Sequence, residues 1–143
     1  MLKPNVVNSN PPWVTTNPEV IRGTIRAAKA RGAATVLVAE AGAMPGRTLQ
    51  SMQTLGIVQV CAEEGAEAVA LDDTTTAPQT PSGAGGWPNG IPIFQTVHDA
   101  DYVINMPCLK THALPGWLTS PQDFAYAQQG VGEHAGIMAW RNV

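Results

Sequence analysis

Two lysines and a histidine in this chain have the types and spacing for chemistry on a small anion. Lys110 and His112 stand two positions apart in the polar segment 105–112. A lysine ammonium binds an anion as a point charge, and a histidine titrates near neutral pH and can move a proton. Lys3 lies in an apolar stretch, where its charge must either reach the rim of the fold or find a partner. We therefore predict that Lys110 and His112 are catalytic and that Lys3 binds a ligand.

Each of these residues also has a structural explanation. A lysine and a histidine after a strand are often solvated or bound to nearby carbonyl groups. Lys3 and Asn5 would be gatekeepers if their strand formed an edge of the sheet. Glu40 and Asp72 could be ligands, but carboxylates commonly end strands without any further role. Cys108 and His112 have a C-x-x-x-H spacing that no second pair completes, so we predict no metal site.

The segment from Asn17 to Gly32 has the clearest helical signals in the chain. Thr16 or Asn17 can cap the helix, Pro18 suits its first position and Gly32 can close it. Apolar residues recur on one side of this helix, as expected where a helix covers a sheet. Its first turn would point backbone N–H groups toward the rim, which suits a carboxylate or phosphate. Asn17 is therefore a predicted ligand-binding residue.

Short apolar runs alternate with helical segments along the chain, which favours a parallel, right-handed α/β sheet. We predict a three-layer α/β fold, a mainly parallel sheet with helices on both faces, incomplete as a domain. A first strand ends near Asn5, and later strands are expected at 34–39, 66–71 and 101–105. Helices are expected at 48–55 and 58–64, an exposed loop at 72–90, an edge strand at 91–94 and a helical turn at 97–100. In such sheets, ligands bind beyond the carboxyl ends of the strands, which selects Asn5 and Asn105 as orienting groups.

Composition excludes several classes of protein. The 143 residues carry a net charge of −3 with 13% charged residues, so no basic field exists for nucleic acid. No apolar run approaches the ~18 residues of a membrane span, and the first residues do not form a secretory signal. We predict a cytoplasmic protein without nucleic-acid or membrane partners. Its two cysteines are expected to be reduced.

Three motifs together resemble the domain-of-unknown-function family 362. They are Leu-Lys-Pro-Asn at 2–5, Thr-Thr-Asn-Pro-Glu-Val at 15–20, and an aspartate-led strand that runs into Asn-x-Pro-x-x-Lys-Thr-His at 105–112. The resemblance covers roughly residues 2–112 and implies an α/β protein of unassigned activity. It also implies a shared site, made of Lys3, Asn5, Asn105, Lys110, Thr111 and His112.

Some members of that family are joined to ferredoxin-like iron-sulfur segments. The Cys-x-x-Cys clusters of such a segment are missing here, so no cluster is implied and the cofactor stays unknown. After His112 the usual Lys-Asn-containing continuation is replaced by Ser-Pro-Gln-Asp at 120–123. We therefore expect a family-like domain at 1–112, a divergent tail at 113–143, and a chain shortened or frame-shifted relative to its family.

Two functions follow as hypotheses. In the first, the chain binds a small anionic metabolite or cofactor at the strand carboxyl ends, as part of a redox or group-transfer enzyme. In the second, it is a non-catalytic interaction module or fragment that needs a homo-oligomer or a partner chain. Apolar tail residues such as Trp117, Phe124 and Trp140 fit the second hypothesis. The sequence leaves open whether the chain is an enzyme.

Overall fold

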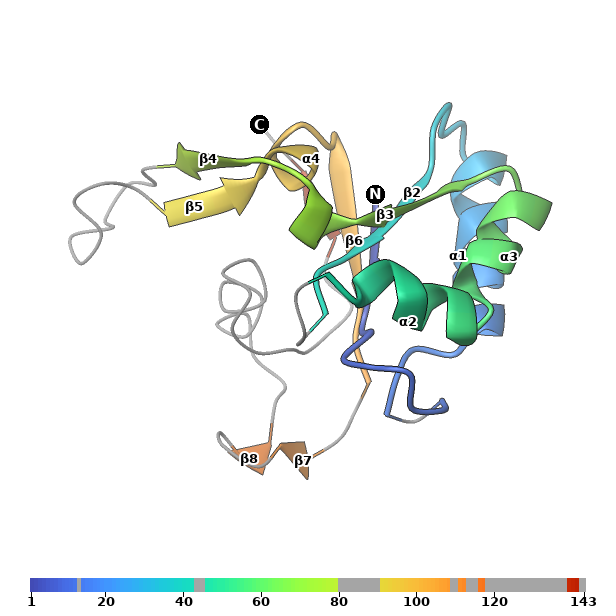
Figure 1. Ribbon diagram of the computed structural model, residues 1–143. Coiled ribbons are helices and arrows are strands. Elements are labelled where there is room, and N and C mark those ends of the chain that lie inside the picture. The colour runs from blue at the N-terminus through green and yellow to red at the C-terminus, as the bar shows by residue number, and fades with distance from the viewer. Residues whose placement is uncertain are drawn as a thin grey trace.

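A mainly parallel sheet forms the centre of the molecule in a computed structural model (Figure 1). The structure describes residues 1–12, 14–42, 46–79 and 91–108, together with the short strands 111–112, 116–117 and 139–141. Four strands pair in parallel in the order β3-β2-β1-β6, and β9 joins β6 in antiparallel fashion. Their bounds are β1 (Leu2–Pro4), β2 (Leu37–Glu40), β3 (Glu67–Ala70), β6 (Tyr102–Met106) and β9 (Ala139–Arg141). The predicted α/β class is confirmed.

Alternate residues of these strands face two separate apolar clusters, as the pleat of a strand requires. Leu2, Val38 and Ile104 belong to the cluster beneath the three longer helices. These helices are α1 (Pro18–Ala30), α2 (Thr48–Thr54) and α3 (Ile57–Glu63), which lie together on one side of the sheet in Figure 1. Val103 belongs to the second cluster, with Val97 of the one-turn helix α4 (Gln95–His98). Helices therefore pack on both faces.

Local signals set the bounds of α1 as expected. The side chain of Asn17 accepts a hydrogen bond from the backbone N–H of Glu19 at 2.9 Å, and Pro18 occupies the first turn. Ile21 and Ile25 are fully buried against the sheet. Gly32 follows the helix with a φ of 91°, a left-handed conformation that glycine adopts without strain. Capping and burial together explain why this helix forms where the sequence predicted it.

The segment predicted as a loop at 72–90 contains more structure than expected. A 3₁₀ turn covers Leu71–Asp73, and β4 (Thr76–Gln79) pairs in antiparallel register with β5 (Ile91–Phe94). Cross-strand pairing with a distant segment produces β4, so the Thr- and Pro-rich local sequence gave no sign of it. Residues 80–90, with the predicted Asn-Gly turn, lie outside the described residues.

The second half of the chain adds three short strands. β7 (Thr111–His112) pairs with β8 (Gly116–Trp117) as a separate antiparallel unit. β9 comes from the segment predicted as a divergent tail and lies along β6, with Ala139 opposite Ile104. Part of the tail therefore belongs to the same sheet as the family-like region.

Candidate functional site

A pocket of about 240 Å³ lies where the loops that follow β1 and β2 meet α2. Because β1 and β2 are adjacent and parallel, both loops leave the sheet at the same edge. The lining residues are Val7, Asn8, Ser9, Gly42, Arg47, Thr48, Gln50, Ser51 and Thr54. Eight of these nine residues are uncharged, and most carry a hydroxyl or amide group.

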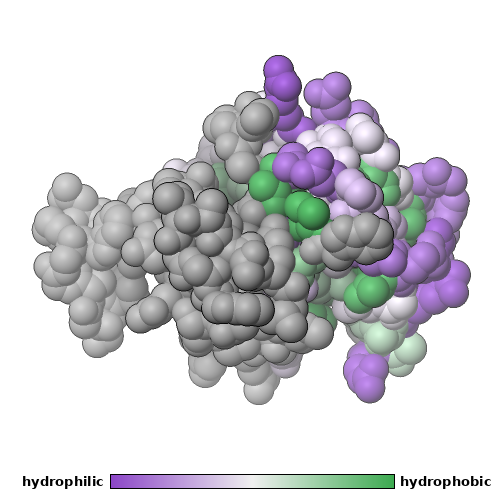
Figure 2. Space-filling view, turned by 90° about the horizontal axis from the view of Figure 1, so that it is seen from below, coloured by the Kyte–Doolittle hydropathy of each residue, from purple (hydrophilic) through white to green (hydrophobic). Residues whose placement is uncertain are grey.

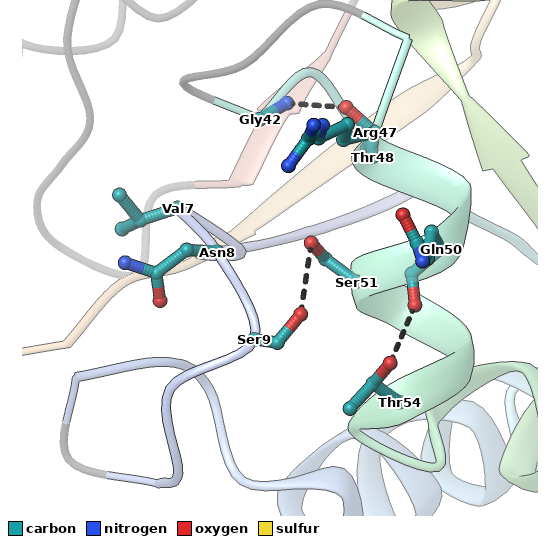
Figure 3. A pocket seen from close by; sticks show the side chains of 9 residues that line it. All are labelled: Val7, Asn8, Ser9, Gly42, Arg47, Thr48, Gln50, Ser51 and Thr54. Carbon is teal, nitrogen blue, oxygen red and sulfur yellow. Dashed lines mark hydrogen bonds between the residues drawn. The ribbon is translucent and has the colours of Figure 1, made fainter.

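Arg47 is the one charged residue among the nine that line the pocket. In the described part of the chain its guanidinium has no hydrogen-bond or ion-pair partner, and the residue is exposed. Figure 3 shows this side chain extending from the start of α2, beside Thr48, toward the gap between α2 and the loop that carries Val7 and Ser9. The pocket therefore has a net positive charge that no lining acid compensates.

Two contacts fix the backbone on either side of Arg47. Gly46 has a φ of 74° and donates its N–H to the Asp72 carboxylate at 2.6 Å, which ties this loop to the end of β3. The hydroxyl of Thr48 accepts from the N–H of Gly42 at 2.8 Å (Figure 3). A Cβ atom at Gly42 would lie 3.1 Å from both that hydroxyl and the carbonyl oxygen of Val6. Gly42 thus allows the two loops to approach closely.

The opposite wall of the pocket is joined to α2 by a hydroxyl pair. Ser9 donates to the hydroxyl of Ser51 at 3.3 Å (Figure 3), and Ser51 is buried. Both groups can exchange this bond for one to a ligand, because each hydroxyl can donate and accept. The pocket therefore combines one cation with adaptable neutral partners.

Lys3 forms an ion pair with Glu40 inside the protein. Its ammonium nitrogen lies 2.8 Å from Glu40 Oε1, and the two side chains are only 6% and 4% exposed. Since β1 lies between β2 and β6, the interpretation of Lys3 and Asn5 as edge-strand gatekeepers is wrong. Glu40, for which the sequence left a ligand role and an ordinary strand end open, also accepts from the backbone N–H groups of Val6 and Ala41.

A second polar cluster fastens the end of β1 to the end of β6. The hydroxyl of Thr16 accepts from the N–H of Asn5 at 2.8 Å and donates to the carbonyl oxygen of Met106 at 2.6 Å. The Cys108 sulfur lies 3.9 Å from the same hydroxyl. Asn5 Nδ2 donates to the carbonyl oxygen of Val14, whereas the buried Asn5 Oδ1 has no hydrogen-bond partner within the described part of the chain.

The structure brings some of the predicted site residues together. Lys3 and Asn105 are register partners on adjacent strands, and Asn5 follows β1 directly; all three are buried. Asn17 is occupied as the cap of α1. Thr111 and His112 form β7, while Lys110 lies outside the described residues. Among the described side chains, those of Lys3, Asn5, Asn17 and Asn105 do not line the pocket.

Sequence reasoning missed Arg47, Ser9 and Ser51. A usable signal existed for Arg47, because it follows the Gly-rich loop after the second strand and directly precedes a helix. The same strand-end rule that selected Asn105 applies to this position. Nothing in the local sequence linked Ser9 with Ser51, which lie 42 positions apart.

A strong charge cluster lies elsewhere, between α1 and the end of α3. Glu64 accepts from Arg26 at 2.6 Å and from Arg22 at 2.9 Å. These hydrogen bonds, those from Arg26 first, lower the pKa of Glu64 to about 2. Because its cations are already paired, this cluster joins two helices and does not offer a free charge to a ligand.

Comparison with known proteins assigns the chain to a family. The model of a family described as a domain of unknown function, DUF362, matches residues 1–119. The chain belongs to the DUF362 family. The match includes the pocket of this DUF362 protein, its Lys3–Glu40 ion pair and β8. No curated protein and no solved structure matches the chain.

Membrane-spanning helices and metal-binding clusters are both absent from the described part of this DUF362 chain. Its helices are all too short or too polar to cross a membrane. Within the same residues, His, Cys, Asp and Glu side chains do not gather in any group of three that could hold a metal ion.

Proposed function

We propose that this DUF362 protein binds a small anionic molecule in the pocket at the carboxyl ends of β1 and β2. The observation that carries the proposal is the uncompensated guanidinium of Arg47, the one charged group among the nine lining residues. An arginine in a polar pocket attracts an anion where no acid pairs with it, and no carboxylate among the described residues forms an ion pair with Arg47. The position also follows the rule for ligand sites in open parallel sheets.

The proposed ligand carries a carboxylate or phosphate group and hydrogen-bonding groups beyond it. A guanidinium presents a planar fork of donors that fits either anion in bidentate fashion. The hydroxyls of Ser9 and Ser51 can each donate to or accept from the remainder of the ligand, and the NH₂ group of Asn8 can donate to it, while Asn8 Oδ1 accepts from the N–H of Asn10. This chemistry suits a small metabolite or cofactor.

We propose that the residues after β6 approach the same edge of the sheet and supply the second side of the site. In support, β6 is parallel to β1, and Thr16 links the ends of both strands. In this proposal Lys110 and Thr111 contact the anion, His112 moves a proton, and Asn5 and Asn105 orient these groups. The activity that would follow is redox or group transfer.

The test is a titration of the ¹⁵N-labelled full chain with inorganic phosphate and a panel of small carboxylates. Saturable shifts at the backbone amides of Asn8, Ser9 and Ser51 are the expected result. Shifts confined to other surfaces would overturn the pocket as the binding site. Lys110→Ala tests the β6 side separately: weaker binding supports its contribution, and unchanged binding removes Lys110 from the site.

The hypothesis of an interaction module depends on uncovered apolar surface. Among the described residues, the large hydrophobic side chains that are well exposed are Val20, Leu49 and Tyr102, which belong to α1, α2 and β6. Figure 2 shows hydrophobic residues of this part as separate patches among hydrophilic ones. Sedimentation at several concentrations tests the hypothesis, since a monomer throughout would contradict an obligate oligomer.

A further inference from the structure

One buried carboxylate accepts hydrogen bonds from both loops that line the pocket, in each case just before the lining residues. Glu40 Oε2 accepts from the N–H of Val6 at 3.0 Å, and Val6 directly precedes the lining residues 7–9. Glu40 Oε1 accepts from the N–H of Ala41 at 2.8 Å, directly before the lining residue Gly42. Lys3 donates to the same Oε1 at 2.8 Å. The ion pair is therefore the point where both loops are anchored.

The hydrogen bonds at position 40 require a carboxylate side chain. Both oxygens of Glu40 face donors: Oε1 faces an ammonium and an N–H group, and Oε2 faces another N–H group. A glutamine would place its NH₂ group against one of these sets of donors in either orientation. A lone carboxylate would be a costly buried charge, which Lys3 compensates.

Stability alone does not explain this ion pair. Taking two charges out of water costs several kcal/mol per ion, and apolar replacements of buried pairs are often neutral or stabilising. The hydrogen bonds of Glu40 are instead specific in space, since they hold the β1 and β2 loops in one relative position. From the loops, the bonds from Gly42 to Thr48 and from Ser9 to Ser51 extend this control to α2.

We propose that Lys3 and Glu40 are positioning residues of the anion pocket: the pair acts through the Val6 and Ala41 amides and does not contact the ligand. This inference rests on the proposed function for its consequence in binding. In this proposal Lys3 acts through Glu40, whereas the sequence predicted that Lys3 contacts the ligand directly. Loosening the loops separates Asn8 and Ser9 from Arg47, so an anion that needs these groups together binds more weakly.

The experiment compares Lys3→Met and Glu40→Gln with a matched control, Glu64→Gln, in the full chain. Glu64→Gln breaks a charge cluster that joins α1 to the end of α3, and Glu64 is not among the residues described as lining the pocket. The first measurement is amide hydrogen exchange at Val6, Ala41 and Gly42. The second is the Kd for inorganic phosphate, taken at a temperature where every variant is folded.

We expect both variants of the pair to speed exchange at these amides and to raise the Kd roughly tenfold, as removal of orienting groups typically does. Glu64→Gln should leave both readouts within about twofold of wild type. Unchanged exchange in Glu40→Gln, or equal changes in Glu64→Gln, would overturn the inference. If Lys3→Met fails to fold, the double variant Lys3→Met/Glu40→Gln provides the test, since it leaves no unpaired buried charge.

The two measurements separate this inference from the proposed function. If the wild-type chain binds no phosphate but the exchange pattern changes as expected, the pair positions the loops and phosphate binding is refuted. If phosphate binds at the pocket amides while the pair variants retain wild-type Kd and exchange, the pocket stands and the positioning role is refuted.

Discussion

The cations of this chain differ in the groups that face them. Lys3 meets Glu40 inside the sheet, and Arg22 meets Glu63 and Glu64 on the helical side. Arg47 has no such acid among the described residues and lines a polar pocket. Only the third arrangement leaves a charge for a ligand, so binding is expected to depend on Arg47 and not on the more numerous paired cations.

Acid should weaken the fold through Glu64. Its pKa is about 2 in the folded chain against an ordinary 4.5, so the unfolded chain binds the proton more readily. The stabilisation is full above about pH 5 and is lost as the pH falls toward about 2. Glu64→Gln should lower stability at pH 7 and flatten its decrease in acid, measured by urea unfolding at several pH values. Exposed Glu67→Gln is the control, and an equal flattening there would contradict this assignment.

The two cysteines should differ in reactivity. Burial raises the pKa of the Cys61 thiol to about 11, and the side chain belongs to the core beneath the helices. Cys108 is only partly buried. Because the thiolate is the reactive form, a thiol reagent should label Cys108 in the folded chain and Cys61 only after unfolding. Peptide mapping after brief alkylation measures this; prompt labelling of Cys61 would contradict it.

At the scale of elements, α1 depends on its buried face. Ile25 is fully buried in the cluster beneath the helices, where its removal leaves a cavity. Ile25→Ala should lower the free energy of unfolding by about 3 kcal/mol, within the usual range for such truncations. The exposed Val20→Ala on the same helix is the control and should cost much less. Equal losses in denaturant unfolding would contradict the assignment of the buried face.

Local signals predicted the elements that form locally. Capping and patterning signals indicated α1, because a helix is capped and patterned by its own residues. The apolar positions predicted to face the sheet were Val20, Ile21, Ile25 and Ala28, and of these Val20 is exposed instead. β4 was missed because its partner, β5, lies beyond residues 80–90. Long-range pairing creates such a strand, and a single segment carries little trace of it.

At the scale of the whole molecule, the sequence located the edge of the sheet where the pocket lies but not the residues that line it. The pocket lies between the loops after β1 and β2, at the strand ends that the rule selects. The partnership of Lys3 with Glu40 was not foreseen, because it depends on β1 and β2 being neighbours in the sheet. Which cations remain free is a property of the assembled fold.

The most direct measurement is phosphate and carboxylate binding to wild type, Arg47→Gln and Arg31→Gln by calorimetry or NMR titration. Arg31 is an exposed arginine just beyond α1, so its variant matches the change in net charge without altering the pocket. We expect Arg47→Gln to weaken binding at least about tenfold, the loss of one charge-assisted contact, while Arg31→Gln binds like wild type. Equal affinity of all three proteins would contradict an anion site built on Arg47.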